Sequence, residues 1–199
     1  MAQDDEDRGW LVFLAQLPAA PSSARVALWR RLRAHGATGL LNGAWVLPRT
    51  IAHTRFFGHL QDSVQAQGGQ AFVLPVAGTP ASTDAVITAS FDADRKREYD
   101  ELAERCAAFL AELRKETAAG KFTFAELEEN EQDLDKLAGW LARIQARDFF
   151  SSGPSAAGRD LLADCRRALE QFAQAVYRAE GIGPEPGEGD ARPINRGKK

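Results

Sequence analysis

Arginines are the side chains of this 199-residue sequence whose spacing best predicts a chemical role. Rows of guanidinium groups bind phosphates, which supply most of the sequence-independent affinity for nucleic acids. The alternative interpretations are a solvated face and ion pairing with the acidic second half of the chain. Six arginines within residues 24–55 are our candidate DNA-binding residues: Arg25, Arg30, Arg31, Arg33, Arg49 and Arg55.

The other reactive side chains do not form a recognisable catalytic or metal site. His35, His53 and His59 lack a helical i, i+4 pairing with a nearby cysteine or acid. Cys106 and Cys165 fall on apolar helix faces, where cysteine usually packs as a small hydrophobe. The sequence has no nucleophile elbow, phosphate loop or HExxH motif. We expect a protein that is not an enzyme and that holds no metal or cofactor.

The charge of the chain is divided along its length. Residues 8–83 contain seven arginines and one acid, Asp62, which gives a net charge of +6. Residues 84–181 contain 20 acids and 14 lysines or arginines, which gives −6. Such asymmetry indicates either a different partner for each half or two halves that dock on each other.

The arginine row belongs to a helix followed by a hairpin. Residues 24–35 have apolar side chains at helical spacing, and Gly36 ends the helix because glycine adopts the left-handed conformation cheaply. Asn42-Gly43 separates two short apolar runs and is the strongest short signal for a β-hairpin. The apolar positions of the helix are Val26, Leu28, Trp29 and Leu32.

The flanking segments complete a β-α-β-β-α-β order. Residues 10–17 are a near-continuous apolar run, which suits a buried strand. Residues 51–67 predict a second helix and residues 70–76 a last strand. This order is that of the ferredoxin-like fold, in which four antiparallel strands carry two helices on one face.

The second half of the sequence is helical. The small residues at 77–83 predict a linker, and helical periodicity follows at 92–118, 124–147 and 156–179. We therefore predict an α+β protein with a ferredoxin-like domain at residues 10–80 and a domain of three or more helices at 84–180. An acidic lead-in at 1–9 and a tail at 181–199, rich in glycine, proline and charge, are expected to be disordered.

The expected setting is cytoplasmic. The first seven residues carry four acids, the opposite of the positively charged start of a signal peptide. No apolar run approaches the roughly 20 residues needed to span a bilayer, so we expect no membrane partner.

Several segments together resemble the amino-terminal region of ChrB-type chromate-resistance proteins. They are WLVFLAQLP, ARVALWRRLRAHGA, LLNGAWVLP, FTFAELEENEQDLDKL and RDFF, and the likeness covers residues 10–178. The first half is also similar to the ferredoxin-like domain of phenylacetate-pathway repressors and to the small CRISPR-adaptation nucleases. Those nucleases place a metal-binding aspartate at the end of the first strand. This sequence has no acid there, which argues against a metal nuclease.

The ChrB-type resemblance implies a cytoplasmic, chromate-responsive regulator that acts at the promoter of a chromate-efflux operon. Its partners would be DNA, chromate or another tetrahedral oxyanion, and a second copy in a homodimer. The alternative is a non-enzymatic ferredoxin-like module that dimerises or binds another protein, without DNA binding.

A chromate sensor must bind a tetrahedral dianion, for which arginine forks and helix N-termini are suited. In the helical half, Arg143 and Arg147 lie one turn apart and Arg159 lies at the start of the next helix. If residues 148–158 fold back, these three arginines could converge on one anion. Otherwise they are surface arginines paired with the surrounding acids.

Overall fold

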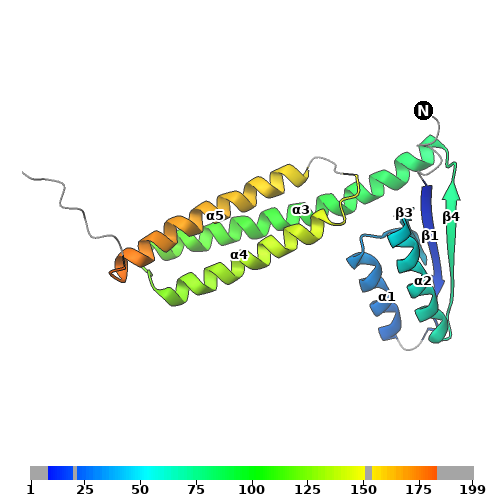
Figure 1. Cartoon of the computed structure of the whole chain (residues 1–199), viewed down its shortest axis with the longest axis horizontal. Helices are drawn as coiled ribbons and strands as arrows, with labels where there is room; N and C mark the ends of the chain where they lie inside the picture. The colour runs from blue at the N-terminus through cyan, green and yellow to red at the C-terminus, as the bar shows by residue number, and fades with distance from the viewer. Residues whose placement is uncertain (1–8, 20–21, 151–153, 183–199) are drawn as a thin grey trace, which may run out of the picture.

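The computed structural model describes residues 9–19, 22–150 and 154–182 and is an α+β fold (Figure 1). Residues 1–8 of the expected lead-in at 1–9, and residues 183–199 of the expected tail at 181–199, lie outside the described residues. No helix within the described ranges combines the length and apolar character needed to cross a bilayer. The elements are β1 (Gly9–Gln16), α1 (Ser22–Ala34), β2 (Thr38–Leu41), β3 (Ala44–Pro48), α2 (Ile51–Ala66), β4 (Gln70–Ala77), α3 (Ala81–Ala118), α4 (Phe124–Gln145) and α5 (Pro154–Ala179).

The first six elements form the predicted ferredoxin-like unit. The strand order is β2-β3-β1-β4, and every neighbouring pair is antiparallel. The turn between β2 and β3 consists of Asn42 and Gly43, with Leu41 paired to Ala44 and Gly43 at a φ of 79°. The hairpin signal in the sequence therefore identified this connection correctly.

Helices α1 and α2 lie on one face of the sheet (Figure 1). Helix α2 begins at a cap in which Thr50 Oγ1 accepts from the His53 amide at 3.0 Å, and it buries Phe57, Leu60 and Val64. Helix α1 buries Leu32 alone, whereas Val26 and Trp29 are 44% and 53% exposed. The sequence therefore predicted this helix correctly, although two of its four apolar positions lie on the exposed side.

The other face of the sheet is partly covered by the start of α3. This helix begins at Ala81, so the predicted linker ends early and helix occupies the expected gap before residue 92. Ile87 and Phe91 are buried with Trp10, whose indole N–H also donates to Asp84 at 2.7 Å. The segment has many small and β-branched residues with modest helix propensity, and tertiary packing overrides that propensity.

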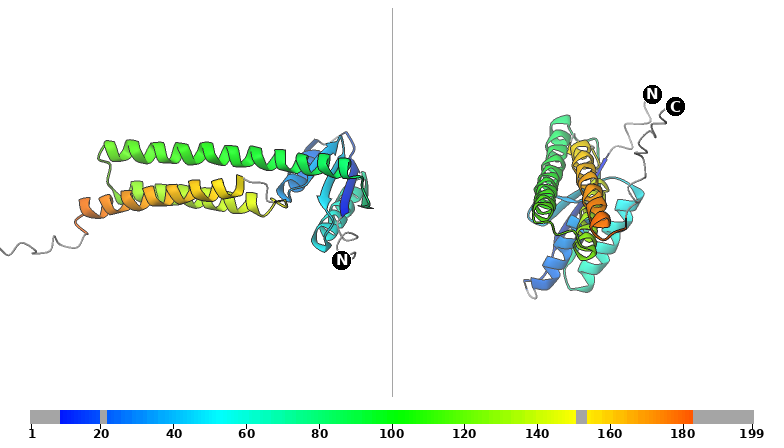
Figure 2. Two further views of the ribbon diagram at one scale, coloured as in Figure 1. Left: turned by 90° about the horizontal axis from the view of Figure 1, so that it is seen from above. Right: turned by 90° about the vertical axis from the view of Figure 1, so that its left-hand side faces the viewer.

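Beyond the sheet, helix α3 continues and packs with α4 and α5 to form the helical unit (Figure 2). Its 38 residues correspond to about 57 Å at 1.5 Å per residue. The apolar core of this unit starts at Tyr99 and includes both cysteines, which are free and fully buried. Burial raises the pKa of both thiols, that of Cys165 to about 12, so both side chains pack as hydrophobes.

A substitution at Phe91 tests how much the start of α3 contributes to the stability of the ferredoxin-like unit. Its ring is 1% exposed and stacks on Trp10 with 5.9 Å between centroids. Phe91→Ala should lower the free energy of unfolding by about 3–5 kcal/mol because it leaves a cavity. Val86→Ala, at a position that is 65% exposed on the same helix, should change it by less than about 0.5 kcal/mol. Urea unfolding monitored by circular dichroism measures both, and equal losses would contradict this packing.

Candidate functional site at the junction of the two units

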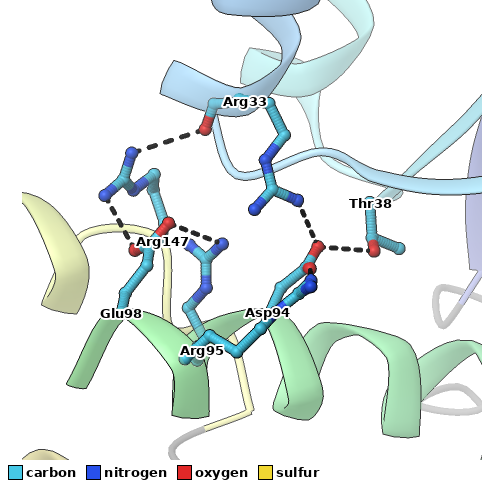
Figure 3. A network of polar contacts seen from close by, with 7 residues as sticks. Arg33, Thr38, Asp94, Arg95, Glu98 and Arg147 are labelled. Atoms are coloured by element: carbon cyan, nitrogen blue, oxygen red, sulfur yellow. Dashed lines mark hydrogen bonds and ion pairs between the residues drawn. The ribbon is translucent and has the colours of Figure 1, made fainter. Parts of the chain in front are cut away.

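A network of charged side chains lies on α3 between the two apolar cores. One core ends at Phe91 and the other begins at Tyr99. Asp94, in the segment between them, is 5% exposed, and its Oδ2 accepts from the Thr38 hydroxyl at 2.8 Å and from Arg33 Nη1 at 2.5 Å. Its Oδ1 accepts from Arg97. Asp94 therefore ties α3 to α1 and β2 (Figure 3).

Glu98, one turn further along α3, bridges two arginines (Figure 3). Its Oε2 lies 2.9 Å from Arg147 Nη2, and its Oε1 lies 3.3 Å from Arg95 Nη2. Arg147, which follows α4, also donates from Nη1 to the Arg33 carbonyl at 3.4 Å. Glu98 thereby joins α3 to the end of α4, and Arg147 continues the connection to α1.

Arg95 is the least satisfied member of the network. Its side chain is 2% exposed, and Nε, Nη1 and Nη2 have no hydrogen-bond partner among the described residues. Burial lowers the pKa of Arg95, the charge of Glu98 opposes that effect, and the charges of Arg147 and Arg33 add to it. A buried guanidinium with one long ion pair is therefore held at the centre of the junction.

Gly36 allows α1 and Arg147 to approach this closely. The Ala37 amide donates to the Leu32 carbonyl at 3.0 Å and the Gly36 amide to the Arg33 carbonyl at 3.0 Å, the pattern of a Schellman helix end. Gly36 has a φ of 79°, and a Cβ there would lie 2.9 Å from Arg147 Cβ. A side chain at this position would be strained and would also push Arg147 away.

An aromatic cluster stabilises the junction beside the charges. Phe149 and Phe150 pack edge-on against Phe91, with centroids 5.9 Å and 5.4 Å away, and Phe150 also lies 5.9 Å from Trp10. Phe149 contacts His53 of α2 at 5.1 Å. The segment after α4 is therefore anchored on the ferredoxin-like unit by its two aromatic rings.

The candidate DNA-binding arginines divide into two groups. Arg33 is 27% exposed and is ion-paired with Asp94, so it belongs to the junction. The other five are exposed, and none has an ion pair among the described residues: Arg25, Arg30, Arg31, Arg49 and Arg55. Arg25 donates to the carbonyls of Pro18 and Ala19, and Arg31 lies 3.4 Å from the Ser63 hydroxyl.

The candidate oxyanion arginines do not all line one cavity. Arg143 and Arg147 line a cleft of about 880 Å³ between α3 and α4, whereas Arg159 does not and instead donates to the Ser155 hydroxyl at 2.9 Å. The cleft also contains four carboxylates, which balance its four cationic side chains (Arg105 and Lys136 are the other two), so it has no excess of positive charge for an anion. The carboxylates are those of Glu112, Glu116, Glu129 and Asp133.

Glu116 is the buried acid of this cleft. Its side chain accepts from Asn130 Nδ2 at 2.8 Å, and both residues are buried. Burial raises the pKa of Glu116, the Asn130 hydrogen bond lowers it, and the hydrogen bond and charge of Glu126 raise it, with a net increase. Within the described residues, no three His, Cys, Asp or Glu side chains are grouped so that they could hold a metal ion.

Sequence reasoning missed Asp94, Arg95 and Glu98. The only local signal was a dense run of charge at a point where the apolar periodicity of the helix should continue from Phe91 to Tyr99. Charged residues at predicted core positions indicate a buried polar network. Their partners, Arg33 and Arg147, are far away in the sequence, so the pairing itself could not be predicted.

Comparison with known proteins places this fold in a family. A family model described as Protein ChrB, N-terminal, matches residues 25–182. The chain belongs to the ChrB N-terminal family. Protein ChrB of Cupriavidus metallidurans is 32% identical over 95 residues, which is 48% of this chain and 29% of that protein. The chain thus matches under a third of the length of this relative, and the ChrB-type resemblance seen in the sequence is confirmed.

Asp94 should make stability depend on pH. Burial raises the pKa of Asp94, but hydrogen bonds from Thr38 and Arg33 and the charge of Arg33 outweigh it and lower the pKa below 3.8. A lowered pKa stabilises the folded state above the unfolded-state value and loses that effect as the pH falls through the folded-state value. Asp94→Asn should therefore cost about 2–3 kcal/mol near pH 7, with a smaller difference from wild type below about pH 4.

Urea unfolding across this pH range measures the difference between wild type and Asp94→Asn. Asp100→Asn is the matched control, because this aspartate pairs with Lys96 on the same helix and is 59% exposed. The control should differ from wild type by less than about 0.5 kcal/mol. A loss in Asp94→Asn that does not vary with pH would contradict the proposed ion pair.

Glu116 should have the opposite effect on stability. Because its folded-state pKa is raised, its favourable contribution is present below the unfolded-state value of 4.5 and is lost as the pH rises through the folded-state value. Glu116→Gln keeps an acceptor for Asn130 and should raise the melting temperature at about pH 7–8 but not at about pH 4. Glu128→Gln, an exposed change on α4, serves as the control in thermal unfolding. A gain that is equal at both pH values would show that ionisation of Glu116 is not its cause.

Proposed function

We propose that this protein is a cytoplasmic, ChrB-like regulator of chromate resistance that controls a chromate-efflux operon and contacts DNA through α1. The observation that carries the proposal is that Arg25, Arg30 and Arg31, all on one helix, are exposed and have no ion pair within the described residues. Such side chains bind phosphates without reading sequence. Membership in the ChrB N-terminal family supports the chromate-related part of the proposal.

The arrangement of α1 suits contact with a large partner. Trp29 is exposed on the same helix, and Arg49 and Arg55 lie exposed on the ferredoxin-like unit. Among the residues that the structure describes, the acids of the helical half form an ion pair with only one of the six candidate arginines, Arg33, through Asp94. The interpretation that the two halves dock mainly through this arginine row is therefore not favoured, and the excess positive charge remains available to an anionic partner.

A second candidate function has an observation of its own. Phe72 and Leu74 on strand β4 are 56% and 44% exposed, and β4 is an edge strand of the sheet. Exposed apolar side chains beside an unpaired strand edge suit pairing with another protein or a second copy. A non-enzymatic module that dimerises through the sheet would use this surface without any need for DNA.

DNA binding can be tested on the exposed arginines alone. The triple change of Arg25, Arg30 and Arg31 to Ala should weaken binding to all sequences alike. It should also reduce the slope of log K against log salt by about 0.9 per lost phosphate contact. Fluorescence anisotropy with a duplex of the operon's promoter and with an unrelated duplex, at several salt concentrations, measures affinity and slope together.

The matched control changes Arg166 and Arg178 to Ala, two exposed arginines on α5. It should leave both affinity and salt slope unchanged. If wild type fails to bind either duplex, the regulator proposal is wrong and the interaction module is favoured. In that case the interaction module should sediment as an oligomer in analytical ultracentrifugation, and charged substitutions at Phe72 and Leu74 should dissociate it.

A further inference from the structure

We propose that Arg33, Arg95 and Arg147 form a binding site for a tetrahedral dianion such as sulfate or chromate, and that the anion enters by displacing the Glu98 carboxylate. The three side chains come from α1, α3 and the end of α4, and the guanidinium groups of Arg95 and Arg147 both lie against the Glu98 carboxylate, while Arg147 also reaches the Arg33 carbonyl (Figure 3). The proposal assigns the oxyanion to the junction, not to the cleft that Arg143 lines.

The buried donors of Arg95 are the first argument. A guanidinium offers five N–H donors in a planar fork, and buried donors are almost always satisfied. Arg95 is 2% exposed, yet three of its nitrogens have no hydrogen-bond partner among the described residues, and Arg147 Nε is in the same condition. A tetrahedral oxyanion has enough acceptor atoms to bind donors of several arginines simultaneously.

The local charge balance is the second argument. The network contains four arginines, Arg33, Arg95, Arg97 and Arg147, and two carboxylates, Asp94 and Glu98. The nearby carboxylate of Asp148 is engaged by the Tyr99 hydroxyl at 3.1 Å. The six network side chains therefore carry an excess of two positive charges, and of three when Glu98 turns away, so the local charge favours a dianion over a monoanion.

The positions of the groups suggest how the anion enters. Arg33, Glu98 and Arg147 are 27%, 18% and 17% exposed at the side chain, so they form the rim of the site, whereas Arg95 forms its floor. Glu98 contacts Arg95 at a single distance of 3.3 Å, which is longer than its 2.9 Å contact with Arg147. Rotation of this one side chain would release donors of both Arg95 and Arg147 to an anion from solvent.

The site also connects an effector to α1. Arg33 lies on the helix that carries the exposed arginines, and its carbonyl accepts from Arg147. Two parts of this inference rest on the proposed function: that chromate is the physiological anion, and that its binding changes the affinity for DNA. The binding of a dianion at the junction does not rest on the proposed function.

The test is isothermal titration of the full chain with sodium sulfate, which is not an oxidant, against sodium chloride at matched ionic strength. Arg147→Lys keeps the charge but loses the fork and should weaken sulfate binding roughly tenfold or more. Glu98→Gln removes the competing carboxylate and should tighten binding several-fold. Arg143→Lys, one turn earlier on α4, should leave binding unchanged.

Circular dichroism of each variant establishes that it is folded, and the shift in melting temperature with sulfate gives a second measure of binding. The proposal is overturned if sulfate binds no better than chloride, or if Glu98→Gln weakens sulfate binding. It is also overturned if Arg143→Lys abolishes binding while Arg147→Lys does not, since the anion would then lie in the cleft.

Sodium chromate in the same titration shows whether chromate binds more tightly than sulfate, and DNA binding is measured separately on the same samples. Sulfate and chromate binding without any DNA binding would refute the proposed regulator and leave the anion site standing. DNA binding without an effect of either dianion on the protein would refute the anion site and leave the regulator standing.

Discussion

A buried guanidinium loses its hydration and needs a negative charge or hydrogen-bond acceptors in exchange. The groups around the buried side chain of Arg95 connect the two units of this molecule. The side chain projects from α3 between Phe91, where one apolar core ends, and Tyr99, where the other begins. Glu98 partly neutralises it and also holds Arg147, whose donor reaches the α1 carbonyl of Arg33. Because Glu98 contacts both arginines and Arg147 also contacts α1, these interactions hold the end of α4, the middle of α3 and the end of α1 together. The orientation of the helical unit on the ferredoxin-like unit depends on this chain of contacts.

The charges and the aromatic rings at the junction contribute differently. Phe149 and Phe150 bury apolar surface against Phe91 and Trp10, and such burial supplies most of the stability of a contact. Buried ion pairs offer little net stability because desolvation offsets their attraction. Removing one partner is nevertheless costly, since the remaining charge is left unpaired. The aromatic cluster therefore supplies most of the stability of the contact between the two units. The arginine network determines the orientation in which the two units meet.

Much of the fold could be predicted because its signals are local. Asn42-Gly43 specifies its turn through backbone conformation alone, and Thr123 caps α4 by accepting from the Glu126 amide three residues later. The start of α3 could not be predicted from the sequence. Its helical conformation depends on the packing of Ile87 and Phe91 against a sheet whose strands lie far from them in the sequence. The site was predicted only in part for the same reason. Arg33 and Arg147 were identified as arginines of interest, but their common neighbours on α3 depend on tertiary packing, as does the exposure of Trp29.

Helix α1 has two sets of arginines with different surroundings, and this difference links the two proposals. Arg33, in its last turn, is held by Asp94 inside the junction, whereas Arg25, Arg30 and Arg31 are exposed on the surface. An anion that replaces Glu98 would change what holds Arg147, and Arg147 contacts α1 through the Arg33 carbonyl. Any change in DNA affinity caused by the anion must be matched by an equal change in anion affinity caused by DNA. Because Arg33 and Arg31 belong to one short helix, that coupling needs only a small displacement of α1 relative to α3.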